Sequence, residues 1–461
     1  MTSVPKLLLL VLFFLSYRSP IAHAGDHGSY KVLSIGSLRT KSVCSESKAV
    51  RSSSGATTVP LHHRHGPCSP LPTKKMPSLE DRLHRDQLRA AYIKRKFSGD
   101  VKKDGQGAGG VEQSHVTVPT TLGTSLNTLE YLITVRLGSP AKTQTVLIDS
   151  GSDVSWVQCK PCLQCHSQVD PLFDPSLSST YSPFSCSSAA CAQLGQDGNG
   201  CSSSSQCQYI VRYADGSSTT GTYSSDTLVL GSNTISNFQF GCSHVESGFN
   251  NDLTDGLMGL GGGAPSLASQ TAGTFGTAFS YCLPPTPSSS GFLTLGAGTS
   301  GFVKTPMLRS SPVPTFYGVR LEAIRVGGTQ LSIPTSVFSA GMVMDSGTII
   351  TRLPRTAYSA LSSAFKAGMK QYRPAPPRSI MDTCFDFSGQ SSVRLPSVAL
   401  VFSGGAVVNL DANGIILGNC LAFAANSDDS SPGIVGNVQQ RTFEVLYDVG
   451  GGAVGFKAGA C

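Results

Sequence analysis

Residues 146–152 read Val-Leu-Ile-Asp-Ser-Gly-Ser, and residues 342–348 read Met-Val-Met-Asp-Ser-Gly-Thr. The two stretches lie 196 residues apart, and each runs from three apolar residues into Asp-Ser-Gly. Each is followed by two apolar residues and a glycine, at residues 257–259 after the first copy and at residues 434–436 after the second. A duplicated frame of this kind predicts two lobes of like topology, each of which places one aspartate.

The sequence around the repeat favours an all-β fold. Similar short β runs precede the two copies, at residues 130–137 and 316–321. Charged residues make up 14% of the chain, glycine is abundant, and no long helical period dominates. Because a single core stops growing at about 250–300 residues, a chain of 461 residues favours more than one lobe. The two lobes are expected to meet near residues 304–314.

The chemistry of the repeat suggests a hydrolase. Two carboxylates held close together cannot both ionise, so Asp149 and Asp345 would share one proton and act on water as a base and an acid. Glycine after each aspartate allows close approach of the backbone, and the neighbouring hydroxyls can hydrogen-bond the carboxylates. These supporting residues are Ser150, Gly151, Ser152, Ser346, Gly347 and Thr348. A single Asp-Ser-Gly is common in turns, so the prediction of catalysis depends on the duplication.

With this repeat, the chain resembles the pepsin-like aspartic proteases, and among them the plant nepenthesin-type group, over residues 120–461. The resemblance implies a bilobed, pepsin-like double β-barrel with the active-site cleft between the lobes. It implies Asp149 and Asp345 as the catalytic dyad, polypeptide substrates and inhibition by pepstatin-type compounds. It also implies a hairpin flap, here residues 211–221, with Asp215-Gly216 at the tip.

Tyr213 matches the family's flap tyrosine, and Trp156 matches the residue to which that tyrosine hydrogen-bonds. Packing in the core is the alternative role of both rings. We expect Trp156, Tyr213, Leu257 and Thr348 to line part of an apolar substrate site.

Three features depart from the family pattern. Ser150 stands where the family usually has Thr, which keeps the hydroxyl but removes a methyl group. Ala214 replaces a common flap glycine and restricts the backbone there. The saposin-like insert of typical plant aspartic proteases is missing after Asp345, which points to the nepenthesin-like, atypical branch.

Fourteen cysteines in a chain with a secretory N-terminus predict disulfides. Twelve of them lie after the first aspartate: Cys159, Cys162, Cys165, Cys186, Cys191, Cys201, Cys207, Cys242, Cys282, Cys384, Cys420 and Cys461. We expect Cys384 to pair with Cys420, and the other pairings stay open. The run Cys162-Leu-Gln-Cys165-His also matches a metal or c-type haem pattern, but disulfides are favoured, and no metal or organic cofactor is expected.

The first 115 residues are interpreted as targeting and regulatory segments. Lys6, the apolar run 7–15 and Ala22-His-Ala predict a signal peptide over residues 1–24, and the apolar run itself is too short to span a membrane. A basic prosegment, called the leader below, is expected over residues 25–115, the N-terminal lobe over 116–305 and the C-terminal lobe over 306–461.

Most of the leader is expected to be irregular up to residue 76, with a helix over residues 78–97 and a Gly-rich linker over 105–110. The stripe predicted for the helix consists of Leu79, Leu83, Leu88, Ala91 and Tyr92. His62, His63 and His65 could form a metal tract or a pH-sensitive element, but a solvated segment is favoured.

Charge separates the leader from the rest of the chain. Residues 25–115 hold 16 Lys and Arg against 8 Asp and Glu, whereas residues 116–461 hold 17 against 20. We therefore expect the leader to cover the acidic lobes as an intramolecular inhibitor. Two alternatives remain: a nucleoid-type DNA-binding protease that uses Lys94-Arg-Lys96 and Lys102-Lys103, and a catalytically inactive homologue that binds peptides or proteins.

The function predicted from the sequence is a secreted aspartic endopeptidase, made as a zymogen and active at acidic pH. Cleavage near residues 105–125 would release the leader. We expect a monomer without a membrane anchor, in the extracellular space or the vacuole rather than the plastid, and without nucleic acid as a partner.

Overall fold

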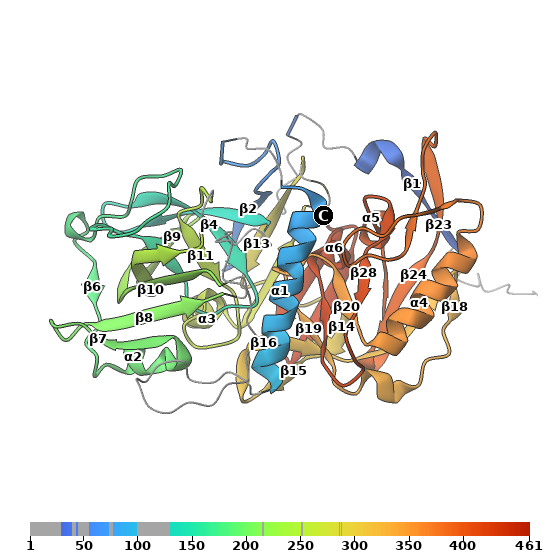
Figure 1. Cartoon of the computed structure of the whole chain (residues 1–461). Coiled ribbons are helices and arrows are strands. Elements are labelled where there is room, and N and C mark those ends of the chain that lie inside the picture. The colour runs from blue at the N-terminus through green and yellow to red at the C-terminus, as the bar shows by residue number, and fades with distance from the viewer. Residues whose placement is uncertain are drawn as a thin grey trace, which may run out of the picture.

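The structure is a computed structural model of the whole chain, and it describes residues 29–38, 43–44, 55–72, 77–98, 130–213, 216–249, 252–284, 286 and 288–461. The predicted signal peptide, the linker and the expected cleavage region lie outside the described residues. Two β-rich lobes lie side by side, and a single long helix, α1 (Leu79–Ser98), runs between them (Figure 1). The arrangement agrees with the predicted bilobed, all-β fold.

The N-terminal lobe and the base between the lobes share one sheet of fifteen strands among the described residues. Its order is β14-β31-β30-β12-β13-β2-β3-β4-β11-β5-β10-β9-β8-β7, with β6 paired to β9. The strands at the base are β12 (Ala278–Cys282), β13 (Ser290–Leu295), β14 (Val303–Pro306), β30 (Phe443–Asp448) and β31 (Ala453–Ala458). Those of the lobe are β3 (Tyr131–Leu137), β4 (Lys142–Asp149), β5 (Trp156–Gln158), β6 (Ser182–Pro183), β7 (Gly198–Cys201), β8 (Cys207–Arg212), β9 (Ser218–Leu230), β10 (Asn233–Ser247) and β11 (Gly256–Gly259).

The C-terminal lobe consists of smaller sheets. One follows the order β15-β16-β19-β29-β20-β28: β15 (Leu308–Ser310), β16 (Val313–Val319), β19 (Met342–Met344), β29 (Gly433–Val435), β20 (Thr351–Leu353) and β28 (Phe423–Ala425). A second contains β18 (Thr329–Gln330), β17 (Leu321–Val326), β24 (Val398–Phe402) and β25 (Ala406–Asn409). A third contains β21 (Pro374–Ala375), β22 (Cys384–Phe385), β27 (Cys420–Leu421) and β26 (Ile416–Leu417).

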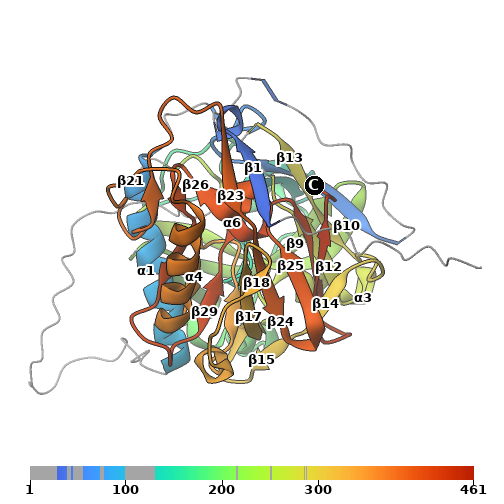
Figure 2. The same ribbon diagram turned by 90° about the vertical axis from the view of Figure 1, so that its right-hand side faces the viewer.

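Helices are short apart from two. The amphipathic helix α4 (Arg355–Gly368) packs on the outside of the C-terminal lobe with Leu361 and Phe365 fully buried (Figure 2). The others are α2 (Ala189–Gln193), α3 (Leu267–Phe275), α5 (Ala412–Ile415) and α6 (Asn437–Gln440), with 3-10 turns η1 (Ile35–Leu38), η2 (Pro175–Leu177), η3 (Gly195–Asp197), η4 (Thr335–Phe338) and η5 (Ser403–Gly405). In the described part of the chain, no helix is both long and apolar enough to cross a membrane.

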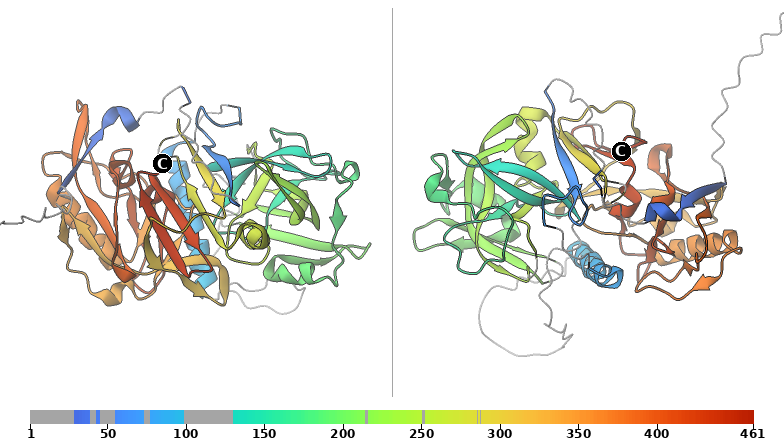
Figure 3. Two further views of the ribbon diagram at one scale, coloured as in Figure 1. Left: turned by 180° about the vertical axis from the view of Figure 1, so that it is seen from behind. Right: turned by 90° about the horizontal axis from the view of Figure 1, so that it is seen from above.

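The leader is built into both lobes. Strand β1 (Tyr30–Ser34) pairs antiparallel with β23 (Ser392–Pro396) in a two-stranded sheet, and strand β2 (Thr57–His63) lies between β13 and β3 (Figures 2 and 3). The prediction that residues 25–76 are irregular is therefore wrong for these two segments. The reason is that both strands form by pairing with distant strands, which supply hydrogen bonds that no local pattern announces.

The predicted helix of the leader is confirmed. Ser78 accepts a hydrogen bond from the backbone N–H of Asp81 at 3.0 Å, so it caps the helix as expected. The buried face differs from the predicted apolar stripe, because Ala91 is exposed and Leu88 only half-buried. Its buried residues are Arg82, Leu83, Asp86, Arg89 and Ile93.

All fourteen cysteines form disulfides, as predicted. The pairs are Cys44–Cys68, Cys159–Cys242, Cys162–Cys165, Cys186–Cys201, Cys191–Cys207, Cys282–Cys461 and the expected Cys384–Cys420. The two sulfur atoms of the haem-like pattern are thus joined to each other. Four of the bridges hold the region between the first aspartate and the flap, called the Cys-rich insertion below (residues 159–207).

Candidate active site

The two copies of the repeat have the same local topology. Strand β4 ends at Asp149 and pairs in parallel with β11, and strand β19 leads into Asp345 and pairs in parallel with β29. Strands β11 and β29 are the apolar-apolar-Gly segments of the sequence. They bond to the dyad loops through the N–H of Leu260, which donates to Asp149 O, and the N–H of Asp345, which donates to Val435 O.

The dyad loops are joined by a reciprocal pair of serines. The backbone N–H of Ser346 donates to the Ser150 hydroxyl at 2.9 Å, and the N–H of Ser150 donates to the Ser346 hydroxyl at 3.1 Å. Both residues are buried. Ser150 therefore keeps the hydroxyl that a threonine would offer at this position, and the two lobes are tied together directly beneath the carboxylates.

Each carboxylate is held by its own loop. Asp149 accepts from the N–H of Gly151 at 2.9 Å and from the hydroxyl of Ser152 at 2.9 Å. Asp345 accepts from the N–H of Gly347 at 3.2 Å and from the hydroxyl of Thr348 at 2.5 Å. The structure thus brings together the predicted supporting residues, and both sites have the same pattern of donors.

Arg89 of the leader helix lies between the two carboxylates. One guanidinium nitrogen, Nη2, is 2.6 Å from Asp149 Oδ1 and 2.7 Å from Asp345 Oδ1, and Nε donates to Asp345 Oδ2 at 2.7 Å. Burial by itself would raise the pKa of Asp345, but the charge and hydrogen bonds of Arg89, with those of Thr348 and Gly347, hold this pKa below its usual value. Both carboxylates are therefore neutralised by one cation of the same chain.

The two glycines of the repeat are required by this close packing. A Cβ atom on Gly151 would lie 2.9 Å from Asp345 Oδ1, and one on Gly347 would lie 2.2 Å from Cζ of Arg89. With Arg89 docked, these short distances favour glycine at both positions, in accord with the close approach expected from the sequence.

The flap residues are partly described. Trp156 Nε1 donates to the hydroxyl of Tyr213 at 2.6 Å, which is the contact that the resemblance implies. Burial raises the pKa of Tyr213, so its hydroxyl stays protonated. Gly216 has a positive φ of 85°, in accord with a tight turn, while Ala214 and Asp215 lie outside the described residues.

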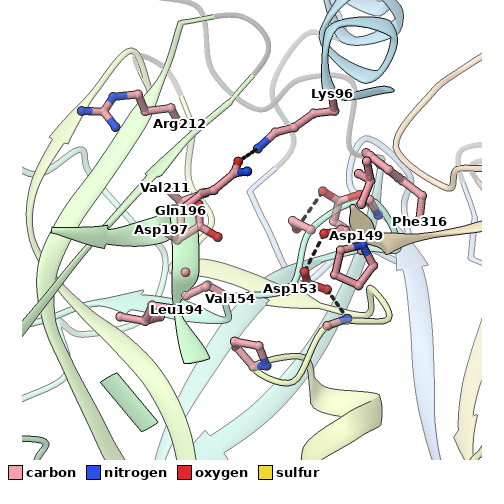
Figure 4. Close-up of a pocket in the computed structure, with 18 of the residues that line it drawn as sticks. Lys96, Asp149, Asp153, Val154, Leu194, Gln196, Asp197, Val211, Arg212 and Phe316 are labelled. Atoms are coloured by element: carbon pink, nitrogen blue, oxygen red, sulfur yellow. Dashed lines mark hydrogen bonds between the residues drawn. The ribbon is translucent and has the colours of Figure 1, made fainter. Parts of the chain in front are cut away.

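A cavity of about 620 Å³ adjoins Asp149 beneath the leader helix (Figure 4). Of the residues predicted to line the substrate site, Tyr213 borders this cavity. Trp156, Leu257 and Thr348 are fully buried with the leader in place and do not border this cavity, and Leu257 packs in the core with Leu147 and Trp156. Their place in the substrate site stays a prediction.

The structure adds residues that the sequence did not single out. Arg89, Asp153, the insertion residues 193–197 and residues 312–316 all line the cavity. In the sequence, Arg89 counted only toward the net positive charge of the leader, and nothing marked it as a partner of the two aspartates. Its spacing from Arg82, Asp86 and Ile93 was the available signal, because these positions recur every three or four residues along one face of a helix.

Several basic side chains of the leader pair with carboxylates of the lobes. Arg64 is paired with Asp252 at 2.8 Å, Arg82 with Glu130, and Lys94 with Asp428 at 2.6 Å. The expectation that the histidines lie in a solvated segment is wrong for His63. This side chain is 2% exposed and lies between Glu130 and the ring of Tyr131. No group of three or more possible metal ligands is found among the described residues.

Known proteins are similar to this chain over most of its length. Residues 131–297 match a family model described as the xylanase inhibitor N-terminal domain, and residues 316–458 match the xylanase inhibitor C-terminal domain. An aspartyl protease family protein of Arabidopsis thaliana is 42% identical over 443 residues, which cover 93% of this chain and 92% of that protein. Aspartic proteinase nepenthesin-2 of Nepenthes gracilis is 37% identical over 349 residues, covering 72% of this chain and 78% of that protein.

Solved structures share the fold at lower identity. The crystal structure of edgp superimposes with a TM-score of 0.59 at 20% identity, covering 72% of this chain and 92% of that one. Basic 7S globulin from soybean gives a TM-score of 0.57 at 20% identity, covering 71% of this chain and 90% of that one. At this identity the likeness concerns the fold alone.

Proposed function

The chain belongs to the pepsin-like aspartic protease family, in the plant branch that includes the nepenthesins, and we propose from this that it is the zymogen of a secreted aspartic endopeptidase. Asp149 and Asp345 are the proposed catalytic residues. The observation that carries the proposal is the pair of matched carboxylates, which two equivalent loops hold on either side of one guanidinium. The guanidinium of Arg89 compensates the charge of both buried carboxylates in the precursor.

The proposed mechanism follows from the shared proton of the pair. Without Arg89, two carboxylates this close favour a state with one proton between them. The ionised carboxylate then removes a proton from water as the water oxygen attacks the peptide carbonyl carbon. The protonated carboxyl donates its proton to the carbonyl oxygen, and the proton taken from water passes to the leaving nitrogen when the C–N bond breaks. One hydroxyl of the tetrahedral carbon returns its proton to the dyad as the new carboxyl group forms, which restores the single shared proton.

The leader is the proposed intramolecular inhibitor. In support, α1 fills the space between the lobes, and Arg89 occupies both carboxylates at once (Figures 1 and 3). Buried pairs on either side strengthen the attachment, including Asp86 with Arg352 at 2.6 Å. Strand β2 contributes backbone hydrogen bonds to β13 and β3, so release of the leader must also break part of a sheet.

Secretion, acidic operation and the monomeric state belong to the same proposal. Seven disulfides fit an oxidising compartment, such as the extracellular space or the vacuole. The proposed partners are polypeptide substrates and pepstatin-type inhibitors. DNA binding is not favoured, because Arg64, Arg82, Arg89 and Lys94 already pair with carboxylates of the chain itself.

The test is activation of the purified precursor. The protein is incubated at about pH 4 and at about pH 7, with and without pepstatin, and digestion of casein is followed together with loss of the leader. We expect proteolysis after acidification only, and its abolition by pepstatin and by Asp149→Asn. Casein digestion that persists with both the inhibitor and the substitution would contradict the dyad assignment.

A second candidate is a protein-binding homologue without activity. The observation in its favour is that both matched family models are named for xylanase inhibitors. Correctly processed wild-type chain that digests no protein, yet binds a glycoside hydrolase such as a xylanase, would favour this candidate. Inhibition of xylanase activity by the processed chain is the measurement that separates the two.

A further inference from the structure

The Cys-rich insertion forms one wall of the cavity beside the dyad (Figure 4). The segment runs from α2 through η3, and its residues Leu194, Gln196 and Asp197 border the cavity opposite the leader helix. Two disulfides hold the segment on both sides, Cys186–Cys201 across it and Cys191–Cys207 from α2 to β8. The wall is therefore fixed to the lobe by covalent bonds and stays in place when the leader leaves.

A leader cation already rests on this wall. Nζ of Lys96 donates to Oε1 of Gln196 at 3.0 Å (Figure 4). The same ammonium lies 5.3 Å from the centre of the Tyr92 ring. The alkyl stem of a lysine can cover apolar surface while its charged end reaches polar groups. Lys96 thus reaches from the leader helix to the insertion with its charged end on a polar group.

Asp197 adds a negative charge next to this contact. Within the described ranges, no hydrogen-bond donor or ion-pair partner contacts its carboxylate. Burial raises the pKa of Asp197 to about 6. The positive charges of Lys96 and Arg212 lower this pKa, and the negative charge of Asp153 raises it. A carboxylate without a fixed partner, beside an amide oxygen that already binds an ammonium, is a site for a further cation.

We propose that Gln196 and Asp197 form a substrate subsite for a Lys or Arg side chain of the polypeptide, and that Lys96 occupies it in the precursor. The inference rests on the proposed function. The Asp197 carboxylate and the Gln196 amide oxygen would accept hydrogen bonds from the ammonium or guanidinium of the substrate side chain. Leu194 and Val154 would contact the aliphatic part of that side chain. Basic residues are then preferred at one fixed position relative to the scissile bond.

The test uses the processed enzyme and a mixture of peptides of known sequence, with the cleavage sites read by mass spectrometry at about pH 4 and at about pH 6. Burial raises the pKa of Asp197 to about 6 in the precursor, so the preference for a basic residue should be stronger at the higher pH, where more of the carboxyl group is ionised. We expect Lys and Arg to be enriched at a single position. For one peptide pair that differs there by Lys or norleucine, Asp197→Asn should lower the kcat/KM ratio of Lys to norleucine by about 3-fold to 10-fold. Asp197→Lys should reverse the preference toward Asp and Glu.

The controls separate the subsite from the catalytic proposal. Glu322→Gln removes an exposed carboxylate on β17 in the other lobe and should leave the Lys to norleucine ratio unchanged. Cleavage by Asp197→Asn with the wild-type ratio would overturn the subsite while the dyad stands, and would leave Gln196 as a contact for the leader only. Failure of the wild-type enzyme to cleave any peptide would overturn the proposed function and the subsite together.

Discussion

Ser150 and Ser346, 196 residues apart, each accept a hydrogen bond from the other's backbone N–H. Their hydroxyls also lie within 3.1 Å of each other, buried beneath the two aspartates. This is the contact by which one lobe positions the carboxylate of the other. Its geometry is symmetrical although the sequences of the two lobes differ widely.

Removal of one hydroxyl of this pair should loosen the site. Ser150→Ala leaves the N–H of Ser346 buried without an acceptor, which costs about 1–3 kcal/mol of folding free energy. We expect a lower Tm and a lower kcat with little change in KM. Ser150→Thr keeps the hydroxyl and is the matched control, expected to retain activity. Equal kcat for the alanine and threonine variants would contradict this role.

Arg89 should control exposure of the dyad in the precursor. Arg89→Gln removes a cation that contacts both Asp149 and Asp345, and two uncompensated carboxylates then oppose docking of the helix. We expect the unprocessed variant to bind fluorescent pepstatin at a pH where the wild-type precursor does not. Lys94→Gln, which removes an exposed ion pair with Asp428, is the control and should behave as the wild type. Pepstatin binding equal in both variants would exclude Arg89 as the block.

Acid release of the leader should depend on its histidines. Burial, then the charge of nearby arginines, lowers the pKa of His63, and the same causes lower the pKa of His65 to about 3, although Asp252 opposes. In the free leader these groups titrate near 6.5. Docking therefore favours the neutral rings and loses stability as the pH falls from about 6.5 toward 3.

The carboxylates around the leader respond later. The pKa values of Asp345 and Asp252 are lowered, mainly by Arg89 and Arg64 against the effect of burial, so their ion pairs persist in mild acid. Burial raises the pKa of Asp86 in the docked leader. Protonation of Asp86 at low pH therefore does not weaken docking. Histidine protonation rather than carboxylate protonation is thus the expected first step.

His65→Gln should shift this transition. The variant keeps a polar, half-buried side chain but cannot take up a proton, so the pH midpoint of leader release should fall below that of the wild type. Release is measured by the binding of fluorescent pepstatin within the first seconds after a pH jump. The sample is the unprocessed protein, in which both Asp149 and Asp345 are intact. His84→Gln, at an exposed position of α1, is the control. An unchanged midpoint for His65→Gln would refute the histidine switch.

A second carboxylate pair, Asp255 and Asp170, should make the fold less stable as the pH rises. Burial and the neighbouring Asp170 raise the pKa of Asp255 to about 8, so the folded chain holds a proton that the unfolded chain releases near pH 4. This contribution to stability is complete below about pH 4 and is lost as the pH rises toward 8. Asp170→Asn removes the repelling charge, so the fall of Tm between pH 6 and 9 should be smaller than in the wild type. A parallel fall in both would contradict the shared proton.

The duplicated residues predicted much of the site because their geometry is local. A strand that ends in Asp-Ser-Gly and a parallel strand that ends in glycine determine where each carboxylate lies, and both copies follow this rule. The cap at Ser78 likewise marked the start of α1 within one residue. These features depend on neighbours in sequence, which the pattern displays.

The features that the sequence could not predict depend on distant partners. Strand β2 does alternate, with Thr57, Val59, Leu61 and His63 buried, but the inward positions include a threonine and a histidine, and its partners lie in β3 and β13. The buried face of α1 is charged because its partners are carboxylates and an arginine of the lobes. An apolar stripe was therefore the wrong signal for the residues of α1 that reach the dyad.

The most direct measurement of the central claim is the rate of peptide cleavage by leaderless Asp149→Asn and Asp345→Asn chains. Each is released through a foreign protease site placed in the linker 105–110, so that processing does not depend on the dyad. Because the two carboxylates act as a unit, each single variant should lose about 10³-fold in kcat, and the double variant should lose little more. Either single variant within about tenfold of the wild-type kcat, still sensitive to pepstatin, would contradict a shared catalytic role for Asp149 and Asp345.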